Sequence, residues 1–183
     1  RGQRRFIDVK GGAGKQYFSI RAYDYAKNHF FLDTVYKGIY DEYFKYSTPV
    51  IPQSSKYYRI KDIEVWEAIT EVTDPHVANA IAIADLPGKK RLQPGGDEWT
   101  AAEINRTIQS GVVEKGRFAL LDSSKYYVDR NLGTLTIFNL RQDRYYGVAY
   151  KIEGATDAKE DDIHFGKLST FRGEKDTLVL RLV

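Results

Sequence analysis

The sequence predicts a mainly β fold, namely an antiparallel β-sandwich of jelly-roll-like type with one or two helical insertions. Three observations indicate this class. Eight to ten short segments carry alternating or continuous apolar residues, turn-forming residues separate these segments, and only two segments show helical spacing. Many short strands with few helices are typical of sandwiches and barrels. The alternative is an α+β fold built on a single antiparallel sheet.

The longest predicted strand covers residues 57–69, YYRIKDIEVWEAI. Ile63 and Val65 share one face, and charged residues occupy the other face. Upstream the phase is opposite, because Ile60 belongs to the apolar set there, and the change falls at residues 61–62. A β-bulge adds one residue to a strand, so a bulge at this point would keep both halves facing one core.

The other predicted strands are shorter and follow the same logic. Trp66 lies on the second face of the long strand, which predicts that this strand is covered on both sides near its end. Residues 129–132, followed by Gly133, have the composition of a hairpin turn. In chain order, we expect the further strands at residues 6–9, 17–25, 80–86, 117–121, 125–128, 133–138, 145–152, 165–169 and 177–183.

Two segments predict helices. In the first, apolar side chains recur every four residues, at Phe31, Val35, Ile39 and Tyr43. This helical spacing favours a helix within residues 33–44. The second covers residues 100–109. There Thr100 is a candidate N-cap with Glu103 at the capping-box position, and Gly111 is a candidate terminator.

Length and composition predict one domain. We expect residues 1–16 to form a flexible, basic and glycine-rich segment, and residues 17–183 to form a single β-rich domain. The net charge of +3 is small and scattered, which argues against nucleic acid as a partner. The absence of cysteine excludes disulfides and thiolate chemistry. Because the chain begins at Arg1 and contains no methionine, we expect it to be a piece of a longer polypeptide.

The sequence predicts no catalytic site, no metal site and no cofactor. The three histidines stand alone, without a partner at metal-binding spacing. An acidic cluster is the weak candidate for a cation site, and it comprises Asp157, Glu160, Asp161 and Asp162. A solvated loop explains this cluster better than a cation site does. Two carboxylates that are distant in sequence can form a glycosidase pair, but no feature of the chain favours one.

Aromatic residues are abundant, with 14 tyrosines, nine phenylalanines and two tryptophans. Such side chains suit a β-sheet core, a protein interface or a platform for sugar rings. Trp99 and Tyr145 are the weak candidates for carbohydrate or interface contacts, because Trp99 lies in a predicted loop and Tyr145 lies at the loop end of the strand expected at 145–152. A place in the core or at a strand rim suits these two residues equally well.

Several stretches, in this order, resemble the SprA/Sov family, the giant outer-membrane translocon proteins of the type IX secretion system that are also needed for gliding motility. The matching segments together span about residues 17–183: HFFL at 29–32, IKDIEVWE at 60–67, NAIAIADLPG at 79–88, YVDRNLGTLTI at 127–137, YGVAYKI at 146–152, FGKLS at 165–169 and the strand at 178–182.

The resemblance implies a non-catalytic structural and interaction domain, outside the membrane, of a very large outer-membrane β-barrel protein. Its partners would be other domains of the same polypeptide, other secretion-system proteins and secreted cargo, with contact to the membrane only through the parent barrel. Its place would be the periplasmic or the cell-surface side of the outer membrane. A carbohydrate-binding β-sandwich module is the alternative function, motivated by the aromatic content.

Overall fold

The structure, a computed structural model, describes residues 27–45, 47–48, 50, 58–70, 76–90, 101–154, 161–171 and 177–183. The described helices are α1 (Thr34–Tyr43) and α2 (Ala101–Ser110), with short 3-10 turns η3 (Ser123–Lys125) and η5 (Ser169–Phe171). The described strands are β1 (His29–Phe31), β2 (Ile60–Ile69), β3 (Val77–Ile83), β4 (Lys89–Lys90), β5 (Val113–Leu120), β6 (Tyr126–Asp129), β7 (Thr134–Ile137), β8 (Tyr146–Ile152), β9 (Ile163–Phe165) and β10 (Leu178–Leu182).

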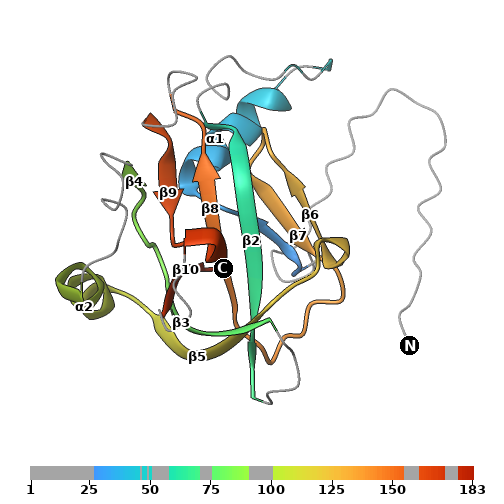
Figure 1. The fold of residues 1–183 in the computed structure, drawn as a ribbon. Helices are drawn as coiled ribbons and strands as arrows, with labels where there is room; N and C mark the ends of the chain where they lie inside the picture. The colour runs from blue at the N-terminus through green and yellow to red at the C-terminus, as the bar shows by residue number, and fades with distance from the viewer. Residues whose placement is uncertain are drawn as a thin grey trace.

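The strands form two sheets, as the sandwich prediction requires. A three-stranded sheet has the order β1-β7-β6, and a seven-stranded sheet has the order β10-β3-β5-β2-β8-β9-β4. Figure 1 shows β6 and β7 beside the larger sheet, with α1 above the strands and α2 at the lower left. The prediction of a mainly β sandwich with two helical insertions is confirmed, and the alternative of a single sheet is wrong.

The larger sheet curls until it meets itself. β10 pairs with β3 on one side, in parallel, and its end also pairs with β8 in antiparallel register. Strands β10, β3, β5, β2 and β8 therefore form a closed ring, while β9 and β4 continue from the second half of β8. All other strand pairs that the structure describes are antiparallel.

Two apolar cores use the two faces of the ring strands. The first lies between the sheets and under α1, and it includes Ile60, Val65, Tyr150 and Tyr36. The second lies on the other face of the same strands, and all five ring strands contribute to it: Trp66, Ala78, Ala80, Ala82, Phe118, Ala149, Leu178 and Leu180, together with Leu168. Four alanines in this set are explained by the small interior that five strands enclose.

The central strand behaves as its sequence predicts. The register of β2 against β8 shifts between Ile60 and Asp62, which is the position of the predicted bulge. Because of this shift, Ile60 and Val65 both reach the core between the sheets. Trp66 points to the ring interior, so the end of β2 is covered on both faces.

Several predicted boundaries need correction. The strand expected at 80–86 is β3, which ends at Ile83 because the chain turns through Asp85 at a φ of 54°. The strand expected at 165–169 ends at Phe165, since Gly166 has a φ of 75° and the 3-10 turn η5 follows. β5 begins four residues earlier than expected, at Val113.

Two short strands were not predicted, and some predictions lie outside the described residues. β1 contains three residues and β4 contains two. Their pairing partners are far away in the sequence: His29 of β1 pairs with Thr136, 107 residues later, and Lys89 of β4 pairs with His164, 75 residues later. The strands expected at 6–9 and 17–25 and the flexible segment expected at 1–16 lie outside the described residues.

Candidate functional site

Among the described residues, a group of aromatic rings gathers on β1, on α1 and at the C-cap of α1, and it is here called the aromatic cluster: Phe31, Tyr40, Tyr43 and Phe44. Phe31 is 42% exposed, Tyr40 37% and Phe44 52%. The rings contact one another in series, with centroids 5.4 Å apart for Phe31 and Tyr40 and 4.6 Å apart for Tyr40 and Phe44. Ring contacts of this kind are favourable and reduce the freedom that the side chains lose when a partner binds.

The helix α1 positions this cluster through its cap and its buried face. Asp33 begins the helix, because its side-chain Oδ1 accepts a hydrogen bond from the backbone N–H of Val35 at 3.2 Å. Its Oδ2 lies 2.7 Å from Nη1 of Arg181, which fixes the start of α1 to the end of β10. Tyr36 and Ile39 are buried in the core. Tyr40 and Phe44, four and eight residues after Tyr36, continue the same face of the helix toward its C-terminal end, where their rings are exposed.

Beside the cluster, β1 forms an edge of the small sheet. The backbone carbonyl of Asn28 accepts from the N–H of Ile137, and the N–H of Leu32 donates to the carbonyl of Gly133, both at 3.0 Å. In an antiparallel ladder the groups between such pairs point to the opposite side, so the N–H and C=O of His29 and Phe31 face outward. Within the described part of the chain, no strand pairs with this outer edge.

A groove of about 440 Å³ lies along the same edge. It separates β1 and the start of α1 from the end of β10 and the turn after β3, and its walls include Phe31, Asp33, Lys37, Asp85, Arg181 and Leu182. The aromatic cluster and this groove therefore form one continuous region of the surface.

A second cavity, of about 260 Å³, lies between the two sheets and is here called the polar pocket. Glu67 of β2 and Tyr146 of β8 come from the large sheet, and Lys125 comes from the turn η3. Asn139 and Arg141 come from the segment that follows β7. Ser124, Leu121, Ile137 and Phe138 complete the lining.

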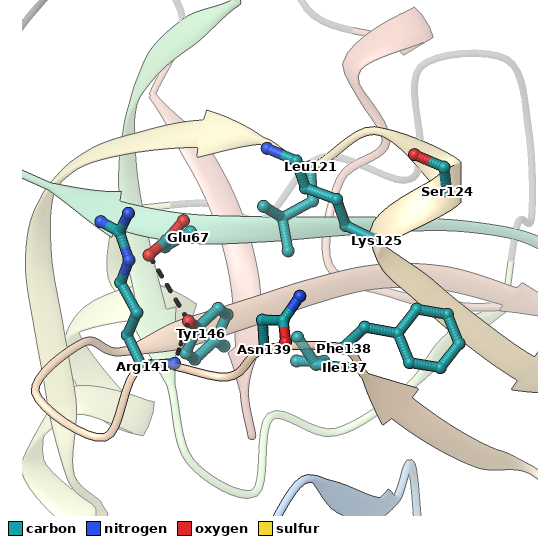
Figure 2. A pocket seen from close by; sticks show the side chains of 9 residues that line it. All are labelled: Glu67, Leu121, Ser124, Lys125, Ile137, Phe138, Asn139, Arg141 and Tyr146. Atoms are coloured by element: carbon teal, nitrogen blue, oxygen red, sulfur yellow. Dashed lines mark hydrogen bonds between the residues drawn. The ribbon is translucent and has the colours of Figure 1, made fainter.

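Hydrogen bonds fix one end of the polar pocket. The backbone N–H of Arg141 donates to the Tyr146 hydroxyl oxygen at 3.0 Å, and the same hydroxyl donates to Oε1 of Glu67 at 3.4 Å. Burial raises the pKa of Tyr146, so its hydroxyl keeps its proton at neutral pH. Figure 2 shows Glu67, Tyr146 and Arg141 at one end, the Phe138 ring at the other, and the side chains of Lys125 and Asn139 between them.

The acidic residues predicted as a weak cation site are only partly described. Asp157 and Glu160 lie outside the described residues, and Asp161 is half-buried next to Asp162. Asp162 is fully buried, and its Oδ1 accepts from the ammonium group of Lys61 at 2.9 Å. This hydrogen bond, with the nearby negative charges, raises the pKa of Lys61.

A second lysine also faces Asp162. The ammonium group of Lys151 lies 3.8 Å from Oδ2 of Asp162 and 2.8 Å from Oδ2 of Asp62. Lysine ammonium groups therefore occupy the neighbourhood in which a hard cation would need several carboxylate oxygens. Among the described residues, no group of three or more histidine, aspartate or glutamate side chains has the geometry of a metal site.

The aromatic candidates from the sequence are not brought together by any described contact. Tyr145 is 51% exposed, directly before β8 and outside both cavities described above. Trp99 lies outside the described residues, so the contact predicted for these two residues stays a prediction.

The residues of the polar pocket were missed by the sequence patterns, because five separate segments of the chain supply them. Alternation places Glu67 and Tyr146 on strands but does not say that the two strands are neighbours. A local signal in the sequence is the asparagine at position 139, and in the structure its φ is 54°. Asparagine tolerates this conformation better than most residues, which marks a turn that aims a polar side chain.

No protein-family model and no curated protein matches this chain. In the part of the chain that the structure describes, no helix combines the length and the apolar character needed to cross a membrane.

Proposed function

We propose that this chain is a non-catalytic interaction domain of a large outer-membrane translocon of the SprA/Sov type, which serves type IX protein secretion and gliding motility. It works by contact with other proteins: neighbouring domains of the same polypeptide, other secretion-system components or secreted cargo. The ordered motifs across about residues 17–183 support the family, and the aromatic cluster is the observation that carries the mode of action.

The aromatic cluster suits a protein partner for two reasons. Aromatic rings are enriched in the buried centres of protein interfaces, where they supply large contact areas at a small loss of side-chain freedom. The exposed neighbours of the rings on α1 are polar or charged, as in the rim of an interface, and they include Lys37, Asp41 and Glu42.

The ionised side chains with defined contacts serve the fold in ways that support a structural role. Asp33 caps α1 and pairs with Arg181. Asp162 is held by two lysines, and Glu64 holds the turn η5 through Ser169. Groups with such partners have their charges compensated in the resting protein.

The proposal is tested in cells that carry the parent gene. The chromosomal codons are changed to give Tyr40→Ser with Phe44→Ser, and the secreted cargo, the gliding speed and the amount of parent protein in the outer membrane are measured. We expect secretion and gliding to fall at least about tenfold while the amount of parent protein stays constant, because two interface aromatics together contribute more than about 1.4 kcal/mol.

The matched control is Tyr127→Ser, which removes an aromatic ring that is 59% exposed on β6, away from the cluster. This variant should secrete and glide normally. Normal secretion and gliding in the Tyr40→Ser, Phe44→Ser strain would contradict the proposed role of the cluster. A parent gene that encodes no outer-membrane barrel would contradict the proposed family.

A further inference from the structure

The polar pocket contains a combination of groups that the proposed function does not use. Its volume of about 260 Å³ lies below the roughly 300–1,000 Å³ that is typical of pockets for drug-sized ligands. The pocket therefore suits one small ring or one side chain. It opens at the surface between the sheets, where Lys125 and Phe138 are both exposed.

The charges in the lining exclude the simplest ligands. Two cations, Lys125 and Arg141, disfavour a simple cation, and the carboxylate of Glu67 disfavours a simple anion. Among the described residues, the Glu67 carboxylate accepts one long hydrogen bond, from Tyr146 at 3.4 Å, which leaves lone pairs that can accept hydrogen bonds from a ligand. A ligand that suits all three groups carries a carboxylate together with hydroxyl or ammonium donors.

The remaining lining groups distinguish between these donors. Asn139 offers an amide that both donates and accepts, which suits neighbouring hydroxyl groups better than an ammonium group. Phe138, 47% exposed, offers an aromatic ring at the end opposite Glu67. Aromatic rings pack against the C–H face of a sugar, while amide and carboxylate groups bind its hydroxyls.

From these observations we propose that the polar pocket binds a single sugar ring that carries a carboxylate, that is, a hexuronic acid. Lys125 pairs with the carboxylate, Glu67 and Asn139 bind ring hydroxyls, and the Phe138 ring contacts the apolar face of the sugar. Arg141, which Figure 2 shows on the Glu67 side of the pocket, balances the charge of the Glu67 carboxylate. This inference is independent of the translocon proposal, because none of the residues that line the pocket belongs to the aromatic cluster.

Three small ligands separate the parts of the proposal when they are titrated into the ¹⁵N-labelled chain. D-glucuronate carries both the ring and the carboxylate, D-glucose carries the ring alone, and acetate carries the carboxylate alone. We expect saturable shifts of the amide signals of Phe138 and Asn139 with glucuronate, and binding at least about tenfold weaker with glucose or acetate, since one charge-assisted hydrogen bond is worth about that factor.

Variants assign the roles of the residues. Lys125→Ala should weaken glucuronate about tenfold and leave glucose unchanged, whereas Phe138→Ala should weaken both. Lys115→Ala is the matched control, because Lys115 is an exposed lysine of β5 that does not line the pocket. Both positions tested are exposed, and equal urea midpoints of all variants show that folding is unchanged.

Three results would overturn the proposal. The first is that the amide signals do not reach saturation with glucuronate up to about 10 mM, because such binding is too weak for a specific site. The second is acetate that binds as well as glucuronate, which identifies a plain anion site. The third is glucuronate binding that survives both Lys125→Ala and Phe138→Ala, which places the sugar elsewhere.

Discussion

Gly133, in the turn between β6 and β7, lies directly against Tyr36 of the helix α1. Its φ is 61°, and its carbonyl accepts the N–H of Leu32 at 3.0 Å just before α1 begins. A Cβ atom at this position would collide with the ring carbons of Tyr36, whose side chain is fully buried. Two independent constraints, the left-handed backbone and the close approach of an aromatic ring, therefore require glycine here.

We expect Gly133→Ala to lower the free energy of unfolding by about 3 kcal/mol or more. The left-handed conformation contributes about 1 kcal/mol of this loss and the overpacking against Tyr36 contributes the rest. Gly38→Ala is the matched control, because Gly38 lies within α1 and an added Cβ there meets no atom within 4 Å. This control should raise stability by about 0.5–1 kcal/mol. Urea unfolding measures both, and equal midpoints for the two variants would contradict the argument.

At the scale of the element, the turn η5 depends on one side chain of β2. The Glu64 carboxylate accepts the backbone N–H of Ser169 at 2.9 Å, the Ser169 hydroxyl at 2.7 Å and the indole N–H of Trp66 at 3.2 Å. The residue before this turn, Leu168, is buried with the ring interior. Glu64 therefore fastens the segment that brings Leu168 to the inner core.

Glu64→Ala should lower the free energy of unfolding by about 2–3 kcal/mol, because three donors lose an acceptor and one of them is the N–H at the start of η5. Glu64→Gln keeps one acceptor oxygen and should lose about half as much. Hydrogen exchange on the folded protein provides the local measurement, since the amide of Ser169 should exchange faster in the alanine variant. Unchanged exchange at Ser169 would show that other contacts hold the turn.

Sequence patterns predicted the elements whose local signals agree with their environment. The bulge in β2 could be located because charged and apolar residues exchange faces between Ile60 and Ile63. β1 was missed because His29–Phe31 precedes a helical stripe directly, and its extended form depends on pairing with β7 more than 100 residues later. The polar pocket was missed for the same reason, namely that its residues are distant in the sequence and come together only when the two sheets pack.

For the whole molecule, the closed ring was beyond any local pattern. The alternation of Leu178 and Leu180 against Val179 predicts a strand, and the structure contains it as β10, with Leu178 and Leu180 in the ring interior and Val179 packed against Ile83 and Leu86. No pattern says that β10 pairs with β3 in parallel and with β8 in antiparallel register. Large side chains such as Leu180 fill the ring, and a Cβ on Gly147 would approach Leu180 Cβ to 2.9 Å, so this position has no room for a side chain.

The packing of the two sheets also buries two tyrosine hydroxyls. Tyr36 donates to the carbonyl of Tyr58 at 2.6 Å, and Tyr150 donates to the carbonyl of Leu32 at 2.9 Å. Burial raises the pKa of both phenols far above the ordinary value of 10.0. The folded protein therefore keeps both phenols protonated at a pH at which the unfolded chain releases their protons.

This difference predicts that the protein loses stability in alkali. A raised folded pKa contributes stability that is complete below the unfolded pKa of about 10 and is lost above it, because the unfolded state then binds fewer protons. Each tyrosine should lower the free energy of unfolding by up to about 1.4 kcal/mol per pH unit above about pH 10. The raised pKa of Lys61 acts in the same direction above about pH 10.5, the ordinary pKa of a lysine.

Urea unfolding at about pH 8 and pH 11 measures the loss of stability. The double change Tyr36→Phe with Tyr150→Phe should reduce this loss, although both changes weaken the protein at neutral pH. Tyr127→Phe, at an exposed site, is the control and should keep the full loss. An equal loss in the double variant would show that other groups cause the alkaline instability.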